Sequence, residues 1–359
     1  MAERAHRTTP LVAGLPGIYG HHVAMAERTH RAIPPRRAAW LSGLLALSLV
    51  LAGCGGAAKA PTKVSVILDW YPWSNHTGLY LAQSRGYFKA EGLDVTIHPP
   101  SNPDDILKVV GQGTDTFGIS YETDVLTSRA AGVPVKSIAA LVQHPLNTVM
   151  TLKGSGITHP RQLEGKKVGT PGIPSDEALL KSMLQADGGS IDRVELVNVG
   201  EDILAALLGK KVDAIIGGYP VHEAIVAEQQ GQPVDMMKVQ DWGVPDFYEL
   251  VLVTNDAMLK QNPETVRKFL RAAVHGYQDA MADKGAALDA LVAASPETDR
   301  KVEGPGLDRL VPYWTDGVPK FGWQTAERWQ KYADWLRASG LLDKPVKVED
   351  CFTTDYLPK

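Results

Sequence analysis

The sequence predicts an α/β protein that is built as two lobes joined by two crossings of the chain. Short β-branched runs alternate with helical stretches of roughly ten to fifteen residues, which is the pattern of parallel α/β sheets. This alternation begins near Val64 and starts again near Lys167. The length of 359 residues, of which 44% are hydrophobic, is enough for two cores of about 150 residues each.

The first α/β unit begins with a β-branched strand and continues as alternating helices and strands. Apolar residues recur at helical spacing in its helices, as Ile106, Val109 and Val110 do in the second one. We expect strands at residues 64–68, 92–97, 116–119 and 135–142, and helices at 77–90, 103–111 and 122–131.

The second unit repeats this order, and the chain then becomes helical to its end. No later run is apolar and β-branched enough to start a third sheet. We expect strands at residues 167–169, 194–197 and 212–216, helices at 175–186 and 202–208, and late helices at 265–281, 285–294 and 325–339.

Two further extended runs, residues 147–153 and 248–254, stand where the first unit passes to the second and where the second ends. Two crossings imply that the C-terminal helices return to the first lobe. We therefore expect one lobe of residues 63–150 and 252–359 and another of residues 151–251. The cleft between two such lobes is a common place for a small-molecule site, and closure about the crossings is the motion this build permits.

Composition excludes several classes of protein. The 37 basic and 41 acidic residues give a net charge of −4, and no run of five like charges occurs, so no nucleic-acid partner is expected. Two cysteines cannot form a multi-cysteine zinc or iron–sulfur site. The ten histidines include no pair at the spacing of metal ligands on one helix, so no metal site is expected.

The N-terminal residues 1–53 have the features of an export signal peptide. Arg36 and Arg37 precede sixteen uncharged residues, 38–53, fewer than the roughly 20 that a spanning helix needs. The following Leu51-Ala-Gly-Cys54 resembles the lipobox of bacterial lipoproteins, in which the cysteine is lipidated, and residues 54–62 would form a tether. The alternative is a hydrophobic tail with a chance cysteine. A start at Met25 gives a signal of ordinary length, so we expect translation to begin there.

Several motifs in the part that follows resemble the solute-binding proteins of ABC importers. They occur in the family's order along nearly the whole mature chain: Gly78-Leu-Tyr-Leu-Ala82, the segment 86–95, Gly118-Ile-Ser-Tyr121, Gly154-Ser-Gly-Ile157, Leu163-Glu-Gly-Lys-Lys-Val-Gly169 and Asp213-Ala-Ile-Ile-Gly217. The resemblance implies the periplasmic-binding-protein (type II) fold. It also implies an extracytoplasmic receptor anchored through Cys54 that delivers its ligand to a permease and its ATPase.

The branch that handles thiamine pyrimidine precursors is the most similar one. Its motifs are the segment 68–80, which reads Leu-Asp-Trp-Tyr-Pro-Trp-Ser-Asn-His-Thr-Gly-Leu-Tyr, and the shorter segments 247–251 and 352–358. This branch implies a monomer that needs no cofactor and binds a formylaminopyrimidine or hydroxymethylpyrimidine compound. The alternatives within the same receptor class are riboflavin, another small heteroaromatic, or a sulfonate.

The same branch includes the eukaryotic-type hydroxymethylpyrimidine phosphate synthases. In that family a lysine holds pyridoxal phosphate as a Schiff base and a histidine of the chain supplies ring atoms. The lysine falls here at Ser120, the histidine falls at Asp124, and the cysteine-rich loop falls at residues 244–248, which contain no cysteine. A hydroxyl group cannot form the Schiff base. We therefore expect that the protein is not an enzyme.

Aromatic and polar residues after the first strand are candidates for ligand binding. In α/β sheets the carboxyl ends of the strands face the ligand. Trp70 follows the first strand and could stack on a planar ring, and Asn75 could donate to and accept from its edge. His76 lies in the same loop. The alternatives are core packing for Trp70, a turn role for Asn75 and helix capping for His76.

Further candidates follow later strands. Tyr121 and Glu122 begin a helix after the third strand, where an acidic residue is also typical of a first helical turn. Tyr248 and Glu249 stand at the second crossing, and Tyr219 follows two glycines at a strand end. Ser175 is a candidate N-cap of a helix whose start could face a polar ligand edge, and the segment lacks the residues of a nucleotide-binding loop.

Overall fold

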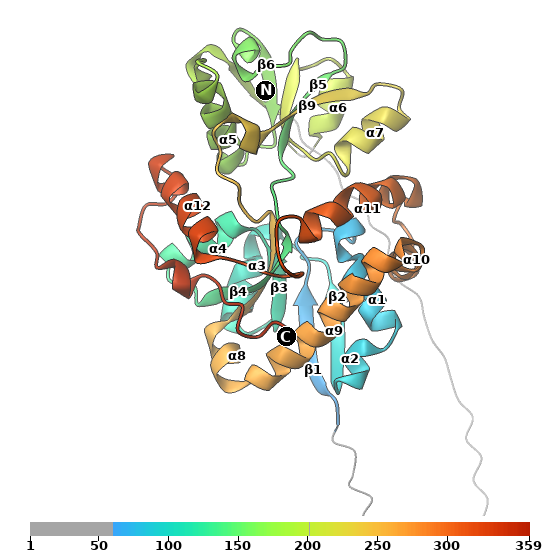
Figure 1. Ribbon diagram of the computed structural model, residues 1–359. Helices are drawn as coiled ribbons and strands as arrows, with labels where there is room; N and C mark the ends of the chain where they lie inside the picture. The colour runs from blue at the N-terminus through green and yellow to red at the C-terminus, as the bar shows by residue number, and fades with distance from the viewer. Residues whose placement is uncertain (1–59, 201) are drawn as a thin grey trace, which may run out of the picture. The chain divides into compact units, whose positions relative to one another are not determined.

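The computed structural model describes residues 60–200 and 202–359, which belong to one compact unit. The predicted signal segment, the start at Met25, Cys54 and most of the predicted tether lie outside the described residues. Two five-stranded sheets form the centres of two lobes (Figure 1). Sheet A has the order β2-β1-β3-β10-β4, and sheet B has the order β7-β6-β8-β5-β9.

The strands of sheet A are short and apolar where they are buried. They are β1 (Thr62–Ile67), β2 (Leu93–His98), β3 (Phe117–Ser120), β4 (Val135–Val142) and β10 (Leu250–Asn255). Those of sheet B are β5 (Thr148–Leu152), β6 (Lys167–Thr170), β7 (Glu195–Asn198), β8 (Ala214–Gly218) and β9 (Val234–Lys238). The predicted strands are confirmed to within two residues at each end, and β9 is one that the sequence analysis did not predict.

The expectation of parallel sheets is wrong for one strand in each lobe. β10 runs antiparallel to β3 and β4, and β5 runs antiparallel to β8 and β9. In sheet A, Val251 at the start of β10 lies opposite Ser120 at the end of β3. A strand that arrives from the other lobe enters at the cleft edge of the sheet, so it runs against the parallel strands that end there.

The positions of β5 and β10 differ from the expected boundaries between the lobes. The expected boundaries, between residues 150 and 151 and between residues 251 and 252, fall inside β5 and β10. Each of these strands is hydrogen-bonded along its length within a single sheet. We therefore propose that the crossings are the segments ahead of them, residues 143–147 and 244–249.

The helices cover both sheets. They are α1 (Thr77–Ser84), α2 (Tyr87–Ala90), α3 (Ile106–Gln112), α4 (Glu122–Ala130), α5 (Pro174–Ala186), α6 (Ile203–Leu208), α7 (Glu223–Gln229), α8 (Asp256–Gln261), α9 (Pro263–Ala282), α10 (Lys284–Ala294), α11 (Arg300–Thr315) and α12 (Ala326–Ala338). Along the described part of the chain, none of them is both long enough and apolar enough to cross a membrane.

The observed helices differ from the prediction in four places, of which one is α8, an unpredicted helix directly after β10. The helix expected over 77–90 is divided into α1 and α2 because Gly86 adopts a left-handed conformation with φ of 74°. α11 was not predicted because Pro305 and Pro312 lie inside it, where proline is normally a helix breaker. α7 was not predicted either, and its residues Glu223–Gln229 follow directly on the turn after Pro220.

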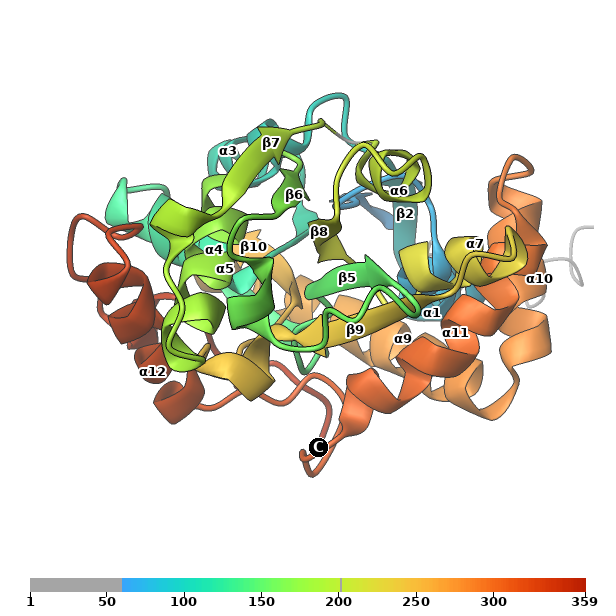
Figure 2. The same ribbon diagram turned by 90° about the horizontal axis from the view of Figure 1, so that it is seen from above.

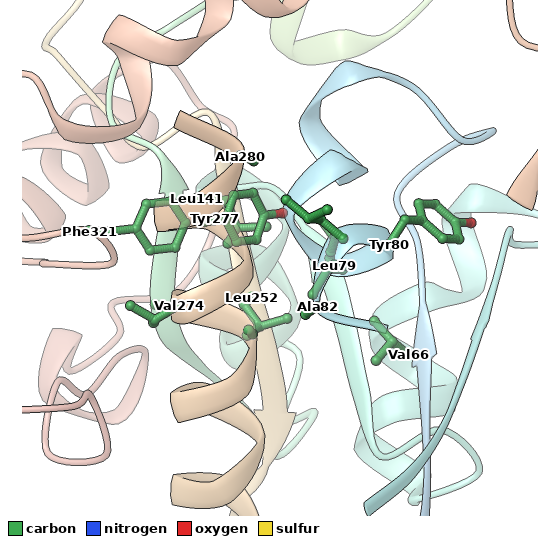
Figure 3. Close-up of a cluster of buried hydrophobic side chains, with 14 of the residues drawn as sticks. Val66, Leu79, Tyr80, Ala82, Leu141, Leu252, Val274, Tyr277, Ala280 and Phe321 are labelled. Carbon is green, nitrogen blue, oxygen red and sulfur yellow. The ribbon is translucent and has the colours of Figure 1, made fainter. Parts of the chain in front are cut away.

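The long amphipathic helix α9 packs against α1 in the core of the first lobe (Figures 2 and 3). The ring of Tyr277 lies over Gly78, and its hydroxyl donates to the backbone oxygen of Asn75 at 2.8 Å. A Cβ atom on Gly276 would overlap with the carbonyl oxygen of Gly78 and lie 2.6 Å from the Cβ of Ala82. Glycine at these two positions is what allows the helices to approach so closely.

We predict that Gly276→Ala destabilises the protein by about 1–3 kcal/mol, because the added methyl group must push α1 away from α9. Gly285→Ala in α10 is the matched control, since a Cβ atom there meets only Asp283 Oδ1, at 3.5 Å. Alanine should be neutral or stabilising at that helical position. Urea unfolding of the two variants measures the difference, and equal stabilities would contradict the close packing.

Candidate functional site

Two adjoining hollows lie between residues of the two lobes, with volumes of about 400 Å³ and about 360 Å³. The residues that line both hollows are Asp69, Trp70, Tyr121, Gly217 and Tyr219. They come from the ends of β1, β3 and β8, so the hollows lie at the carboxyl ends of strands from both sheets. We call the two hollows together the cleft.

The loop after β1 forms one wall of the cleft. Trp70 is 38% exposed, and its ring meets that of Tyr71 edge to face at 5.6 Å. The loop is held from behind by His76, which is fully buried. Its Nδ1 accepts from the backbone N–H of Trp73 at 3.2 Å, so the proton is on Nε2, which donates to Asp69 Oδ1 at 2.7 Å. His76 therefore fixes the loop and the Asp69 carboxylate.

Asn75 is also fully buried behind this wall. The indole Nε1 of Trp314 donates to its side-chain oxygen at 3.0 Å, and Tyr277 donates to its backbone oxygen. Neither Asn75 nor His76 is among the residues that line the cleft. Packing against α9 and α11 holds Asn75 in place, and its side-chain Nδ2 has no hydrogen-bond partner among the described residues. Both ring nitrogens of His76 are bonded within the loop itself.

Tyrosine hydroxyls and a carboxylate meet across the cleft. Tyr219 donates to Glu249 Oε1 at 2.7 Å, and Glu249 Oε2 accepts from the backbone N–H of Leu146 at 2.7 Å. Burial raises the pKa of Glu249 to about 7, in spite of these two hydrogen bonds. Burial also holds the pKa values of Tyr121 and Tyr219 well above 10, so both hydroxyls keep their protons.

Glu122 and Tyr248 lie behind the cleft surface rather than on it. The backbone N–H of Tyr248 donates to Glu122 Oε2 at 2.6 Å, and burial holds the pKa of Glu122 well above its usual value. The Tyr248 hydroxyl accepts from the backbone N–H of Thr325 at 2.9 Å, and the Arg328 guanidinium lies 4.0 Å from the centre of its ring. Direct ligand contact is therefore not seen for either residue.

Phe247 lines the cleft in place of Tyr248. Side chains alternate between two sides of an extended chain, so Phe247 and Glu249 face the cleft while Tyr248 faces away from it. This alternation was the sequence signal that could have identified Phe247.

The start of α5 forms the opposite wall. Ser175 lines the cleft, but the prediction that it caps the helix is wrong, because α5 begins at Pro174 and its N-cap is Ile173. Its neighbour Asp176, which was not among the predicted site residues, lines the cleft as well. Asp176 Oδ1 accepts from Asn147 Nδ2 at 2.7 Å, and Asn147 Oδ1 accepts from the backbone N–H of Gly217 at 3.2 Å. Asn147, from the first crossing, thereby joins α5 to the end of β8.

Five of the nine candidate residues line the cleft, and four support it from behind. Those on the surface are Trp70, Tyr121, Ser175, Tyr219 and Glu249. Those behind it are Asn75, His76, Glu122 and Tyr248. Within residues 60–200 and 202–359, no cluster of His, Cys, Asp and Glu side chains is arranged to hold a metal ion.

Two α/β lobes, each with one antiparallel strand that follows a crossing, have the fold of the periplasmic binding proteins. The NMT1/THI5 like family matches residues 73–287, and the chain belongs to this family.

Similar proteins agree with both the fold and the family. The formylaminopyrimidine-binding protein of Halalkalibacterium halodurans is 37% identical over 88% of this chain and 97% of its own length. A 4-amino-5-hydroxymethyl-2-methylpyrimidine phosphate synthase of Saccharomyces cerevisiae is 29% identical over 82% of this chain and 88% of its own length. The crystal structure of the periplasmic aliphatic sulphonate binding protein of Escherichia coli matches with a TM-score of 0.65 and 16% identity, over 80% of this chain and 96% of that one.

We predict that Glu249→Gln changes how stability depends on pH. The folded wild type keeps a proton on Glu249 up to about pH 7, whereas the unfolded chain loses it near the usual value of 4.5. Relative to the variant, the wild type should therefore lose stability as the pH rises from about 4.5 to about 7, by about 3 kcal/mol in all. Unfolding by urea at pH 5, 6, 7 and 8 measures this, and parallel curves would contradict it.

Proposed function

We propose that this protein is the extracytoplasmic solute-binding component of an ABC importer and that it captures a thiamine pyrimidine precursor of the formylaminopyrimidine type. The observation that carries this is the cleft, which is lined by Trp70 and Tyr121 from the first lobe and by Tyr219 from the second. Its volume of about 400 Å³ is in the range of small-molecule sites. The relative from Halalkalibacterium halodurans supports the choice of ligand.

In this mechanism the ligand's ring lies against Trp70, and the tyrosine hydroxyls and carboxylates meet its polar edge. The lobes close about the two crossings when ligand is bound. A permease and its ATPase then recognise the closed form. We propose that the protein acts as a monomer and needs no cofactor.

The residues at the synthases' reactive positions support a binding role rather than catalysis. Ser120 is 2% exposed, and its hydroxyl donates to Asp124 Oδ2 at 3.5 Å. A serine cannot form a Schiff base with pyridoxal phosphate, and an aspartate cannot supply imidazole atoms. We propose on this ground that the protein is not an enzyme.

Calorimetry of the purified protein against formylaminopyrimidine, hydroxymethylpyrimidine, thiamine and riboflavin tests the proposal. We predict micromolar or tighter binding to one of the pyrimidines. Trp70→Ala should weaken it by about tenfold or more, because the stacking surface is lost. Trp242→Ala is the matched control, since Trp242 is a partly buried tryptophan that packs against His159 outside the cleft.

The outcomes separate the ligand from the class of protein. Binding to riboflavin alone would support the proposed class of receptor and show that its ligand is riboflavin rather than a pyrimidine. No binding to any of the four compounds would remove the case for this ligand. Equal losses in Trp70→Ala and Trp242→Ala would show that the effect is not one of stacking in the cleft.

We also propose that Cys54 is lipidated and anchors the protein to the membrane. We predict that the full chain, expressed in a bacterium that exports lipoproteins, is recovered with the membranes, whereas Cys54→Ser is not anchored there. Cys351→Ser is the control, because this second cysteine is buried in the fold. Fractionation and the intact mass of the purified protein measure the difference, and an unmodified, membrane-free wild type would contradict the anchor.

A further inference from the structure

The cleft contains many acidic side chains and, apart from His222, no basic ones. Its two hollows are lined by neither lysine nor arginine. The carboxylates that line them are Asp69, Glu223 and Glu303 in the first hollow, with Asp104, Asp124, Asp176 and Glu249 in the second. The imidazole of His222, which also lines the first hollow, is already bonded through Nδ1 to Glu223 Oε1 at 2.8 Å. An anionic ligand would therefore meet mainly acidic side chains here, with no lysine or arginine to offset the desolvation of its own charge.

One of these carboxylates has an acceptor oxygen left unused. Asp176 is 4% exposed, and its Oδ1 is bound to Asn147. Its Oδ2 has no hydrogen-bond partner among the described residues. A buried acceptor without a partner costs free energy, so such an atom on a residue that lines a cleft points to a ligand that completes it.

The absence of a side chain on Gly217 lets this oxygen lie close to the backbone at the end of β8. A Cβ atom on Gly217 would lie 3.2 Å from Asp176 Oδ2, and the residue has a φ of 99° that side chains rarely adopt. Gly217 lines both hollows. A ligand that reaches the end of β8 at Gly217 is therefore next to Asp176 Oδ2.

We propose that the cleft selects an uncharged or cationic amino-heteroaromatic over its phosphate or sulfonate counterparts, and that Asp176 Oδ2 accepts a hydrogen bond from the ligand's amino group. This inference rests on the proposed function and adds the ligand's charge and its anchoring residue. Burial raises the pKa of Asp176 to about 6, so the carboxylate is mainly ionised at neutral pH and accepts from an amine.

The beginning of α5 could be considered as an anion site, since a helix N-terminus attracts negative charge. Asp176 itself lies in the first turn of α5 and lines the cleft, and Glu177 follows it in the same turn. In α7 the first-turn residue Glu223 already accepts from the backbone N–H of Tyr219 at 2.8 Å. Carboxylates of the protein thus stand where a phosphate would have to bind.

Two pairs of compounds test the charge selection in calorimetry with the wild-type protein. Each pair shares one ring system and differs in a phosphate: hydroxymethylpyrimidine with its phosphate ester, and riboflavin with riboflavin 5′-phosphate. In whichever pair the protein binds, we predict that the compound without phosphate binds at least 30-fold more tightly than its phosphate ester. Equal affinity for pyrimidine and phosphate would overturn the inference and leave the proposed function intact.

Asp176→Asn tests the anchor, because it presents an amide in place of the free oxygen while an oxygen can still accept from Asn147. We predict at least tenfold weaker binding of hydroxymethylpyrimidine. A probe that lacks the 4-amino group should bind wild type and variant equally well, which a merely structural role for Asp176 would not produce. Glu177→Gln is the matched control, since it removes the same charge from an exposed position in the same helical turn.

The thermal midpoint separates misfolding from lost binding. Asp176→Asn removes a buried charge, so the midpoint of the ligand-free variant should be unchanged or raised. Unchanged affinity in Asp176→Asn would overturn the anchor. Selective binding of riboflavin over its phosphate, with no binding to the pyrimidines, would contradict the proposed pyrimidine ligand and support the selection against phosphate. No binding to either pair would overturn both.

Discussion

The arrangement of the site depends on the two proposed crossings, after which the chain enters each sheet as the strand next to its edge strand. Glu249, in the second crossing, accepts from Leu146 in the first crossing and from Tyr219 on the wall of the cleft. His144 Nδ1 and Asp246 Oδ1 join the same two crossings at 2.9 Å. These bonds hold both crossings next to Tyr219, which directly follows the carboxyl end of β8. The cleft lies at this end of the parallel strands.

Much of the fold could be predicted because its determinants are local. β-branched runs and helical spacing identified most strands and helices, and an aromatic residue after the first strand indicated the cleft. α11 was missed because Pro305 and Pro312 contradict its local propensity, and packing overrides that propensity. Antiparallel β5 and β10 were missed because strand direction depends on where the chain re-enters a sheet, which local periodicity does not encode.

The site was predictable in position more than in side-chain role. A polar side chain next to a cleft can face the ligand or form a buried hydrogen bond with the protein. The second occurs where another residue of the fold lies close enough to bond to it. Glu122 is committed to the backbone of Tyr248, 126 positions along the chain, and Asn75 to Trp314, 239 positions along it. No pattern in the sequence reveals such pairs. The free oxygen of Asp176 became visible only once its neighbours were placed.

The C-terminal helices constrain how the proposed closure can work, because both of them contact both lobes. In α11, Glu303 accepts from the backbone of Ser74 at 2.7 Å, and Arg309 donates to the backbone of Pro220 at 2.9 Å. In α12, Tyr332 is bonded to Thr123 at 2.8 Å, and Trp335 donates to Ser182 at 3.2 Å. Opening the lobes must break one bond of each pair, at a net cost of about 1 kcal/mol each. A ligand shifts the equilibrium only by contacts it makes in one state. In the proposed mechanism, the contacts from Trp70 on one lobe and Asp176 on the other would therefore couple binding to closure.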